Sequence, residues 1–309
     1  MTCRVSDEYI MTGNPVQPSC ISCDILCDPM EDLYASPSNS RLGRAVETRL
    51  LGSDHSSWTG RDPVFVRTVA DVPTALYINY AAPKSYASRL APELFKPLTL
   101  SGRKDATLFT ILCFQLERAR PEWVPASLSA FVPRIMQSNW RFYGHLTEAS
   151  AEPRPCVFFV RTVTTSLALA FFGRRLARCF PLHRAHRMRL ESSGDEIVAR
   201  IEPGGGSAPA LYYAGRYTKA AEVHDAFKQE FSSFHDYARW IIDQHLSVVR
   251  WPHEYVVQDM HLDFRAARIV PLTCTAAEVD FIADEFEIID SFTVEGLRVF
   301  LDNIYARRT

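Results

Sequence analysis

Lysine is scarce in this sequence. Five of the 34 basic residues are lysines, namely Lys84, Lys96, Lys104, Lys219 and Lys228. Chemistry that needs a lysine nucleophile therefore has few candidate positions, and the polar segments around all five predict solvated side chains. The 36 acidic residues leave a formal net charge of −2. A chain without an excess of positive charge is not expected to bind nucleic acid.

Long apolar runs are also missing. The most apolar one, residues 162–173, is about half as long as the roughly 20 residues that a membrane-spanning helix needs, and arginines close it on both sides. The N-terminus has no basic segment followed by an apolar one, so no secretory signal is expected. Four cysteines lie scattered in apolar segments, which suits a reducing compartment. We therefore expect a cytoplasmic protein without a membrane partner.

Several common catalytic and binding signatures are absent. No G-x-S-x-G motif, which carries the serine of many hydrolases, occurs. The glycine triplet at residues 204–206 is not continued by a helix with Lys-Ser or Lys-Thr, so it predicts a flexible turn and not a phosphate loop. His224, His235 and His245 stand too far apart to hold one ion. We expect no metal and no other cofactor in the core.

Residues 1–62 show no sustained apolar period and are rich in Ser, Pro, Asp and Gly, which predicts a loosely ordered extension. Cys20, Cys23 and Cys27 lie within it. Thiolates at this spacing can share a zinc ion or an iron–sulfur centre, but only Cys3 and His55 could supply the fourth ligand of such a site. We favour the alternative that the cysteines are incidental, in a disordered leader or upstream of a true start at Met30.

From residue 63 to residue 309 the pattern is that of one β-rich domain. Apolar or alternating runs predict strands at residues 64–69, 75–80, 107–116, 139–146, 157–164, 211–217 and 255–271, and a hairpin over 188–201. Helical spacing predicts helices at 83–94, 221–248, 276–286 and 294–305, while residues 166–180 fit either type. Many strands without a βαβ alternation predict an α+β, mainly antiparallel domain.

Three segments, in order, resemble the acetoacetate decarboxylase-like superfamily. Residues 76–94 (LYINYAAPKSYASRLAPEL) resemble its opening strand and a helix that closes on L-P-x-x-L. Residues 137–143 (QSNWRFY) are similar to the E-V-N-L-R-x-Y strand of an uncharacterised bacterial branch. Residues 173–188 (GRRLARCFPLHRAHRM) resemble G-R-x-x-x-x-x-P-K-K of the decarboxylases and P-Y-x-x-A-x-M of that branch. The resemblance implies a cone-like β-barrel with a few flanking helices around an apolar pocket.

The decarboxylases of this superfamily use a lysine that forms a Schiff base with a β-keto acid, beside a second lysine that lowers its pKa. The matching residues here are Leu182 and His183, and a glutamate that faces the substrate would fall at Gln137. Because an imine requires a free amine, Schiff-base chemistry is not expected at Leu182. The paired losses suggest that the pocket was kept while its chemistry changed.

Within the implied pocket we expect His183, Arg141 and Tyr143 to be catalytic. A histidine can exchange protons near neutral pH, and an arginine can hold a carboxylate. The substrate-binding residues that we expect are Gln137, Asn139, Glu117, Arg174, Leu182 and His186. Period two places Asn139, Arg141 and Tyr143 on one strand face. In the alternative, that face meets solvent, and His183 is a structural residue of an alternating strand.

Three functions remain open from the resemblance. We favour an enzyme of the lyase or isomerase/cyclase class that acts on an oxo-acid or polyketide-like substrate in secondary metabolism. Its reaction would be a dehydration, cyclisation, isomerisation or decarboxylation without an imine. The second is a non-catalytic module that binds a small ligand, and the third is an imine-forming lyase with a displaced lysine. The partner is a small molecule in each case, and a homo-oligomer stays open.

Overall fold

The computed structural model describes residues 67–147, 152–172, 182–204, 208–219, 221–251, 254–280, 282 and 285–308. The predicted extension with its cysteine cluster lies outside these residues, and so does Arg174, so the domain boundary stays a prediction. No helix of the described part is long and apolar enough to cross a membrane. Within the same part, no three acidic, histidine or cysteine side chains are grouped as metal ligands would be.

Strands make up most of the described chain. In chain order they are β1 (Thr68–Pro83), β2 (Phe95–Pro97), β3 (Ala106–Pro121), β4 (Ile135–Leu146), β5 (Arg154–Thr164), β6 (Leu182–Arg184), β7 (Arg187–Ser193), β8 (Glu196–Glu202), β9 (Leu211–Tyr217), β10 (Leu246–Trp251), β11 (Glu254–Asp263), β12 (Arg268–Val279) and β13 (Glu287–Arg308). The helices are α3 (Lys84–Leu90), α4 (Leu167–Phe172) and α5 (Phe234–Ile242), with short 3₁₀ turns η3 (Leu128–Phe131) and η5 (Asp225–Phe227).

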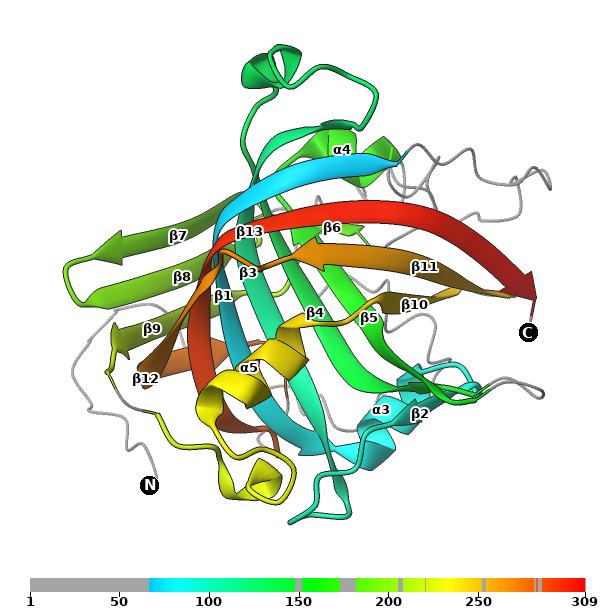
Figure 1. The fold of residues 1–309 in the computed structure, drawn as a ribbon, viewed down its shortest axis with the longest axis vertical. Coiled ribbons are helices and arrows are strands. Elements are labelled where there is room, and N and C mark those ends of the chain that lie inside the picture. Colours follow the sequence, from blue (N-terminus) through cyan, green and yellow to red (C-terminus); the bar gives the residue numbers. More distant parts are fainter. Residues whose placement is uncertain are drawn as a thin grey trace, which may run out of the picture.

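Seven of the strands close into a ring in the order β1, β3, β4, β5, β10, β11 and β13, because β13 pairs with β1 as well as with β11. From β13 the sheet continues outward through β12, β9, β8 and β7, which project to one side in Figure 1. The pairs are antiparallel except for β5 with β10 and β5 with β6. This architecture confirms the predicted α+β, mainly antiparallel cone-like barrel.

Both faces of the ring strands are buried. On one face, which we call the α3 face, residues such as Ile78, Phe109 and Trp140 pack with α3 and with β7 to β9. On the other, the α5 face, all seven ring strands contribute to a second cluster that packs with α5. A strand that is buried on both faces has apolar residues at nearly every position, which explains the almost unbroken apolar run at residues 107–116. Truncation of the fully buried Trp140 would cost about 3–5 kcal/mol of stability.

The long helix predicted over residues 221–248 is wrong. Only η5 and the two-turn helix α5 form there, and β10 begins at Leu246. Ser233 starts α5 as its N-cap by accepting a hydrogen bond from the Asp236 amide, at 3.1 Å. The apolar spacing suggested a helix because Phe227 and Phe231 both pack in an aromatic cluster with Tyr237. Phe227 is buried and Phe231 is half-buried, but the two do not belong to one helix.

The two late helices predicted at residues 276–286 and 294–305 are also wrong. Residues 276–279 belong to β12 and residues 294–305 to β13. Thr275, expected as an N-cap, instead donates its hydroxyl to the carbonyl of Ala214 at 3.1 Å. Pairing of β13 with three other strands outweighs local helical spacing, because strand formation depends on neighbours that are distant in sequence. The strand at residues 211–217 and the β7–β8 hairpin are confirmed.

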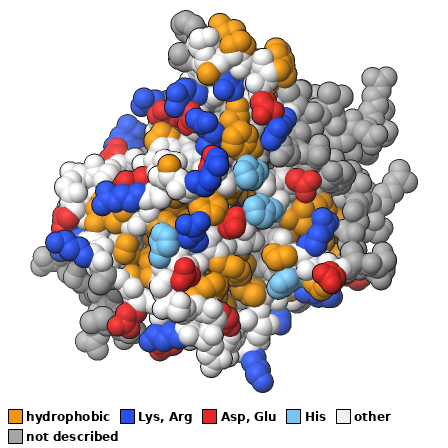
Figure 2. Space-filling model, viewed as in Figure 1, with side chains coloured by type: hydrophobic (Ala, Val, Ile, Leu, Met, Phe, Trp, Pro, Cys, Tyr) orange, Lys and Arg blue, Asp and Glu red, His pale blue; other side chains and the backbone are white. Residues whose placement is uncertain are grey.

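Charge on the surface is mixed. On the side of the molecule seen in Figure 2, basic and acidic side chains are interspersed among apolar ones. Many charged side chains of the described part pair locally, as Arg265 does with Asp263 at 2.9 Å and Arg103 with Glu287 at 2.6 Å. Exposed pairs of this kind contribute little to stability, about 0–1 kcal/mol each. The functional chemistry is therefore better sought among the buried polar residues.

Candidate functional site

Strand β4 carries four of the expected site residues on one face. Gln137, Asn139, Arg141 and Tyr143 occupy alternate positions of β4, and Tyr143 belongs to the cluster on the α5 face. Their exposed fractions are 7%, 8%, 3% and 1%. The Gln137 amide donates to Asn139 Oδ1 at 3.0 Å. Period two therefore brings these residues together on the α5 face, and that face is buried.

Arg141 is a buried cation held by two phenols. Its Nη2 donates to Tyr143 Oη at 2.9 Å, and its guanidinium lies 5.3 Å from the Tyr143 ring centre and 5.6 Å from that of Tyr77. Burial by itself would lower the pKa of Arg141, but the phenols of Tyr143 and Tyr77 more than offset it, so the group stays charged. Burial also raises the pKa of Tyr77 to about 12, against the effect of Arg141.

The charge of Arg141 has no acidic counterpart among the described residues. Its Nε is buried and makes no hydrogen bond. Removing a charge from water without an opposite charge is strongly unfavourable, so such groups are usually paired or serve a ligand. A guanidinium recognises a carboxylate or a phosphate through parallel hydrogen bonds. Arg141 is therefore a candidate anion-binding residue on the α5 face.

A polar row runs from Arg141 across four neighbouring strands. Arg141 on β4 pairs with Thr110 on β3, Thr110 with Asn79 on β1, and Asn79 with Asp290 on β13. The Thr110 hydroxyl donates to Asn79 Oδ1 at 2.5 Å, and Asn79 Nδ2 donates to Asp290 Oδ1 at 2.7 Å. On the α5 side, Tyr237 Oη donates to Asp290 Oδ2 at 2.7 Å.

Asp290 stands in this row as a partly buried acid. Burial raises the pKa of its carboxyl from 3.8 to about 6, although the hydrogen bonds from Asn79 and Tyr237 oppose this rise. A carboxyl group with such a pKa can both accept and donate a proton near neutral pH. Sequence reasoning missed Asp290. The available signal was a lone acidic residue within an apolar run, but that run was not identified as a strand.

The two residues that match the decarboxylase lysines point to different faces. Leu182 pairs with Thr162, and Thr162 pairs with Asn139, so the side chain of Leu182 lies on the α5 face. His183 pairs with Val163, which belongs to the α3-face cluster. His183 is fully buried there. The structure therefore does not bring His183 together with Arg141, while it places Leu182 on the same face as Arg141.

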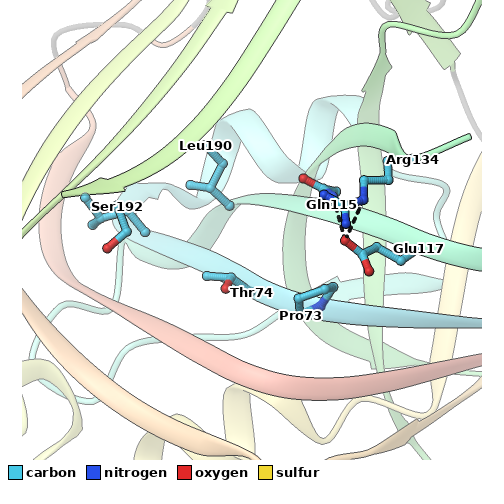
Figure 3. Close-up of a pocket in the computed structure, with 8 residues that line it drawn as sticks. Pro73, Thr74, Gln115, Glu117, Arg134, Leu190 and Ser192 are labelled. Carbon is cyan, nitrogen blue, oxygen red and sulfur yellow. Dashed lines mark hydrogen bonds and ion pairs between the residues drawn. The ribbon is translucent and has the colours of Figure 1, made fainter.

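Glu117 lies at a separate cavity of about 190 Å³. Its Oε1 accepts from Arg134 Nε at 3.0 Å and from Gln115 Nε2 at 2.8 Å, and Figure 3 shows both side chains turned toward it. Leu190 from β7 lines the same cavity and packs against the α3-face cluster. Glu117 is thus apart from Arg141. His186 is exposed, and its backbone amide donates to the carbonyl of Glu202 at 2.9 Å.

None of the five lysines lies on the α5 face near Arg141. Lys96, Lys104, Lys219 and Lys228 are exposed, and Lys228 pairs with Asp225 at 2.7 Å. Lys84 is half-buried at the start of α3, where its Nζ donates to Thr99 Oγ1 at 2.5 Å. Among the described residues, the α5 face thus carries a buried cation, Arg141, and a carboxyl with a raised pKa, Asp290, and none of the lysines.

Comparison with known proteins identifies the fold. No family model matches the chain, and no curated protein does. Among solved structures, an acetoacetate decarboxylase-like enzyme from Sphingomonas wittichii RW1 matches 79% of this chain and 94% of its own, with a TM-score of 0.53 and 10% identity.

Two further structures agree with this match. Acetoacetate decarboxylase from Legionella pneumophila matches 85% of this chain and 95% of its own, with a TM-score of 0.52 and 9% identity. The enduracididine biosynthesis enzyme MppR, complexed with pyruvate, matches 81% of this chain and 93% of its own, with a TM-score of 0.51 and 10% identity. The resemblance seen in the sequence is thereby confirmed at the level of structure, and the chain has the acetoacetate decarboxylase-like fold.

Proposed function

We propose that the protein is an enzyme that binds an oxo acid at Arg141 and acts on it by proton transfer, without an imine. The observation that carries this proposal is the buried guanidinium of Arg141, which has no acidic partner in the described chain. A carboxylate of the substrate would supply the missing charge. The same fold holds pyruvate in one of the similar structures, which supports an oxo acid by analogy of fold alone.

Each residue of the row then has a role. Arg141 orients the carboxylate, and Tyr143 fixes the guanidinium through its hydroxyl. Asp290 accepts or donates the proton at carbon next to the carbonyl, and its two hydrogen bonds keep it in place. Leu182 supplies an apolar wall in place of a nucleophile. Dehydration, isomerisation, cyclisation and decarboxylation all use such a proton transfer, and we place the reaction in a cytoplasmic biosynthetic pathway for secondary metabolites.

His183 stays a separate hypothesis for the acid or base. Because its side chain belongs to the α3 face, it would act only on a substrate held on that face. On that face, Arg134 pairs with Glu117 at 3.0 Å. Asp290 shares its face with Arg141 and is therefore the stronger candidate.

The binding of short oxo acids tests the anchor. Calorimetry with pyruvate and 2-oxobutanoate should show an affinity for the wild type that falls at least about tenfold in Arg141→Gln, because a charge-assisted bidentate contact is lost. Arg134→Gln is the matched control, since Arg134 lines the cavity at Glu117 and not the surroundings of Arg141. Equal affinity of wild type and Arg141→Gln would overturn the assignment of Arg141.

Isotope exchange tests the chemistry. In D₂O, the C3 hydrogens of 2-oxobutanoate should exchange faster with the wild type present than with buffer alone, and Asp290→Asn should abolish the gain. Exchange measured by NMR needs no knowledge of the natural product. Tight binding without exchange or turnover would favour the second function, a non-catalytic binding module.

Borohydride trapping tests the third function. Borohydride with pyruvate should leave the wild type unmodified, whereas a reduced adduct would favour the displaced-lysine lyase.

A further inference from the structure

Gln258 is a buried amide whose hydrogen-bonding groups are both unused. It lies on β11 with an exposed fraction of 1%, and neither Nε2 nor Oε1 has a hydrogen-bond partner in the structure. Its backbone carbonyl is engaged, since it accepts from Ser247 Oγ at 3.3 Å. Gln258 alternates with Val256 of the α5-face cluster, so its side chain lies on the same face as Arg141.

Such a side chain needs an explanation. Nearly all buried polar atoms in folded proteins have a partner, and an unpaired one destabilises the fold. An apolar residue at this position would bury as well and would leave nothing unpaired. Other polar atoms on the same face also lack a partner among the described residues, among them Tyr77 Oη, Thr162 Oγ1 and Arg141 Nε. Single unpaired atoms also occur on the α3 face, as at Tyr80 Oη. Gln258 differs because the donor and the acceptor of one amide are both unpaired on the face that carries Arg141, which indicates a polar ligand rather than a packing defect.

Register relates Gln258 to Arg141. Gln258 pairs with Ser247 on β10, Ser247 with Val157 on β5, and Val157 with Tyr143 on β4, the residue that holds Arg141. Three strand steps of about 4.8 Å separate the backbones of Gln258 and Tyr143 by roughly 14 Å, and Arg141 lies two residues further along β4. The side chains of arginine and glutamine are both long, so one small ligand on this face can contact both of them.

We propose that Gln258 is the second anchor of the substrate, and that the substrate is an acid whose far end both donates and accepts hydrogen bonds. Arg141 takes the carboxylate, and the Gln258 amide pairs with a primary amide or a group of equal capacity. This inference deepens the proposed function and rests on it. The Gln258 amide offers one acceptor and a donor, so a far end that is apolar leaves both unpaired.

Matched ligand pairs test the second anchor. Glutaramate and adipamate are carboxylic acids that end in a primary amide, and 5-methylhexanoate and 6-methylheptanoate replace the amide atoms by methyl groups. The wild type should bind one of the amides at least about tenfold more tightly than its methyl counterpart, because only the amide satisfies Gln258. Gln258→Met should remove this preference. Gln115→Met, in the cavity at Glu117, should keep the preference for the amide.

The outcomes separate the two proposals. The assignment of Gln258 is overturned if the wild type does not prefer the amide, or if the preference survives in Gln258→Met. This holds even where 2-oxobutanoate binds through Arg141. A preference for the amide that is lost in Gln258→Met supports Gln258 as an anchor. If 2-oxobutanoate binding is at the same time unaffected by Arg141→Gln, the proposed function is overturned. Thermal unfolding of ligand-free Gln258→Met should occur no earlier than in the wild type. A clearly lower midpoint would show a structural role and overturn the ligand role.

Discussion

The side chains of Leu182 and His183 lie on opposite faces of β6, although the two residues are neighbours in the chain. Their partners on β5 show this, since Leu182 pairs with Thr162 and His183 with Val163. A strand alternates its side chains, so two consecutive residues cannot both face one pocket. Leu182, which the sequence resemblance predicts to match the first lysine of the decarboxylases, therefore lies on the same face as Arg141, and His183 does not.

Asparagine at position 290 should stop proton transfer, while asparagine at position 183 should not. Asp290 shares the α5 face with Arg141, and a general acid or base contributes about 10²–10⁴-fold to a rate. We expect Asp290→Asn to lower the C3–H exchange rate of 2-oxobutanoate at least about hundredfold. His183→Asn should change it by less than about threefold. A hundredfold loss in folded His183→Asn would return the catalytic role to the histidine.

The stability of the wild type relative to Asp290→Asn should fall as the pH rises from about 4 to about 6. The folded protein binds the Asp290 proton more tightly than the unfolded chain, because the pKa is raised from 3.8 to about 6. Stability from this group is therefore fully present below pH 4 and lost above pH 6. The change should reach at most about 3 kcal/mol, since part of the side chain meets solvent.

Urea unfolding of both proteins at several pH values measures this difference. Taking the difference between wild type and variant removes the titration of the other groups, which both proteins share. A difference that is constant between pH 4 and pH 6 would show that the Asp290 pKa is not raised. A difference of opposite sign would show that the pKa is lowered.

Replacing Arg141 by methionine should leave stability unchanged or raise it, while binding of oxo acids is lost. Methionine fills a buried space of similar shape, and replacing buried charge by apolar groups is often neutral or stabilising by about 1–4 kcal/mol. Tyr143 keeps its hydrogen bond to the carbonyl of Ile241, at 3.3 Å. Chemical unfolding of ligand-free protein measures the effect. A loss of about 3 kcal/mol or more would make Arg141 a structural residue instead.

The sequence predicted the barrel more reliably than the helices. Period two at residues 139–143 placed Asn139, Arg141 and Tyr143 on one face, because a strand buried on both faces keeps strict alternation. The same reasoning failed for residues 221–248 and 294–305. There, apolar residues pack against distant strands and an irregular segment, and their spacing resembles that of a helix without forming one.

The polar row around Arg141 could be predicted only in part. Arg141 and Tyr143 lie two residues apart, so local alternation was enough to join them. Asp290 and Gln258 reach the α5 face from β13 and β11, and only the pairing of strands far apart in sequence places them there. The pKa of Asp290 depends on burial by α5, which no local pattern encodes. His183 was expected in the pocket because of the resemblance, although alternation along β6 places it on the face opposite to Leu182.

Lysine at position 182 should restore imine formation. Its amine would lie on the apolar α5 face near the cation of Arg141, and both burial and a nearby positive charge lower a lysine pKa, by up to 3–5 units in full burial. The free amine should attack the carbonyl of pyruvate held by Arg141. We expect borohydride to trap one pyruvate adduct in Leu182→Lys, visible by mass spectrometry, and none in the wild type.

His183→Lys is the matched control for this gain of function. It introduces the same amine one residue along the chain but on the α3 face, away from Arg141. Peptide mapping should locate the adduct of Leu182→Lys at residue 182, and the double variant with Arg141→Gln should trap much less of it. Equal trapping in both lysine variants would mean that pyruvate is not held on the α5 face, because an amine on either side of the sheet would then suffice. Trapping in His183→Lys alone would move the substrate to the α3 face and restore His183 as its acid or base.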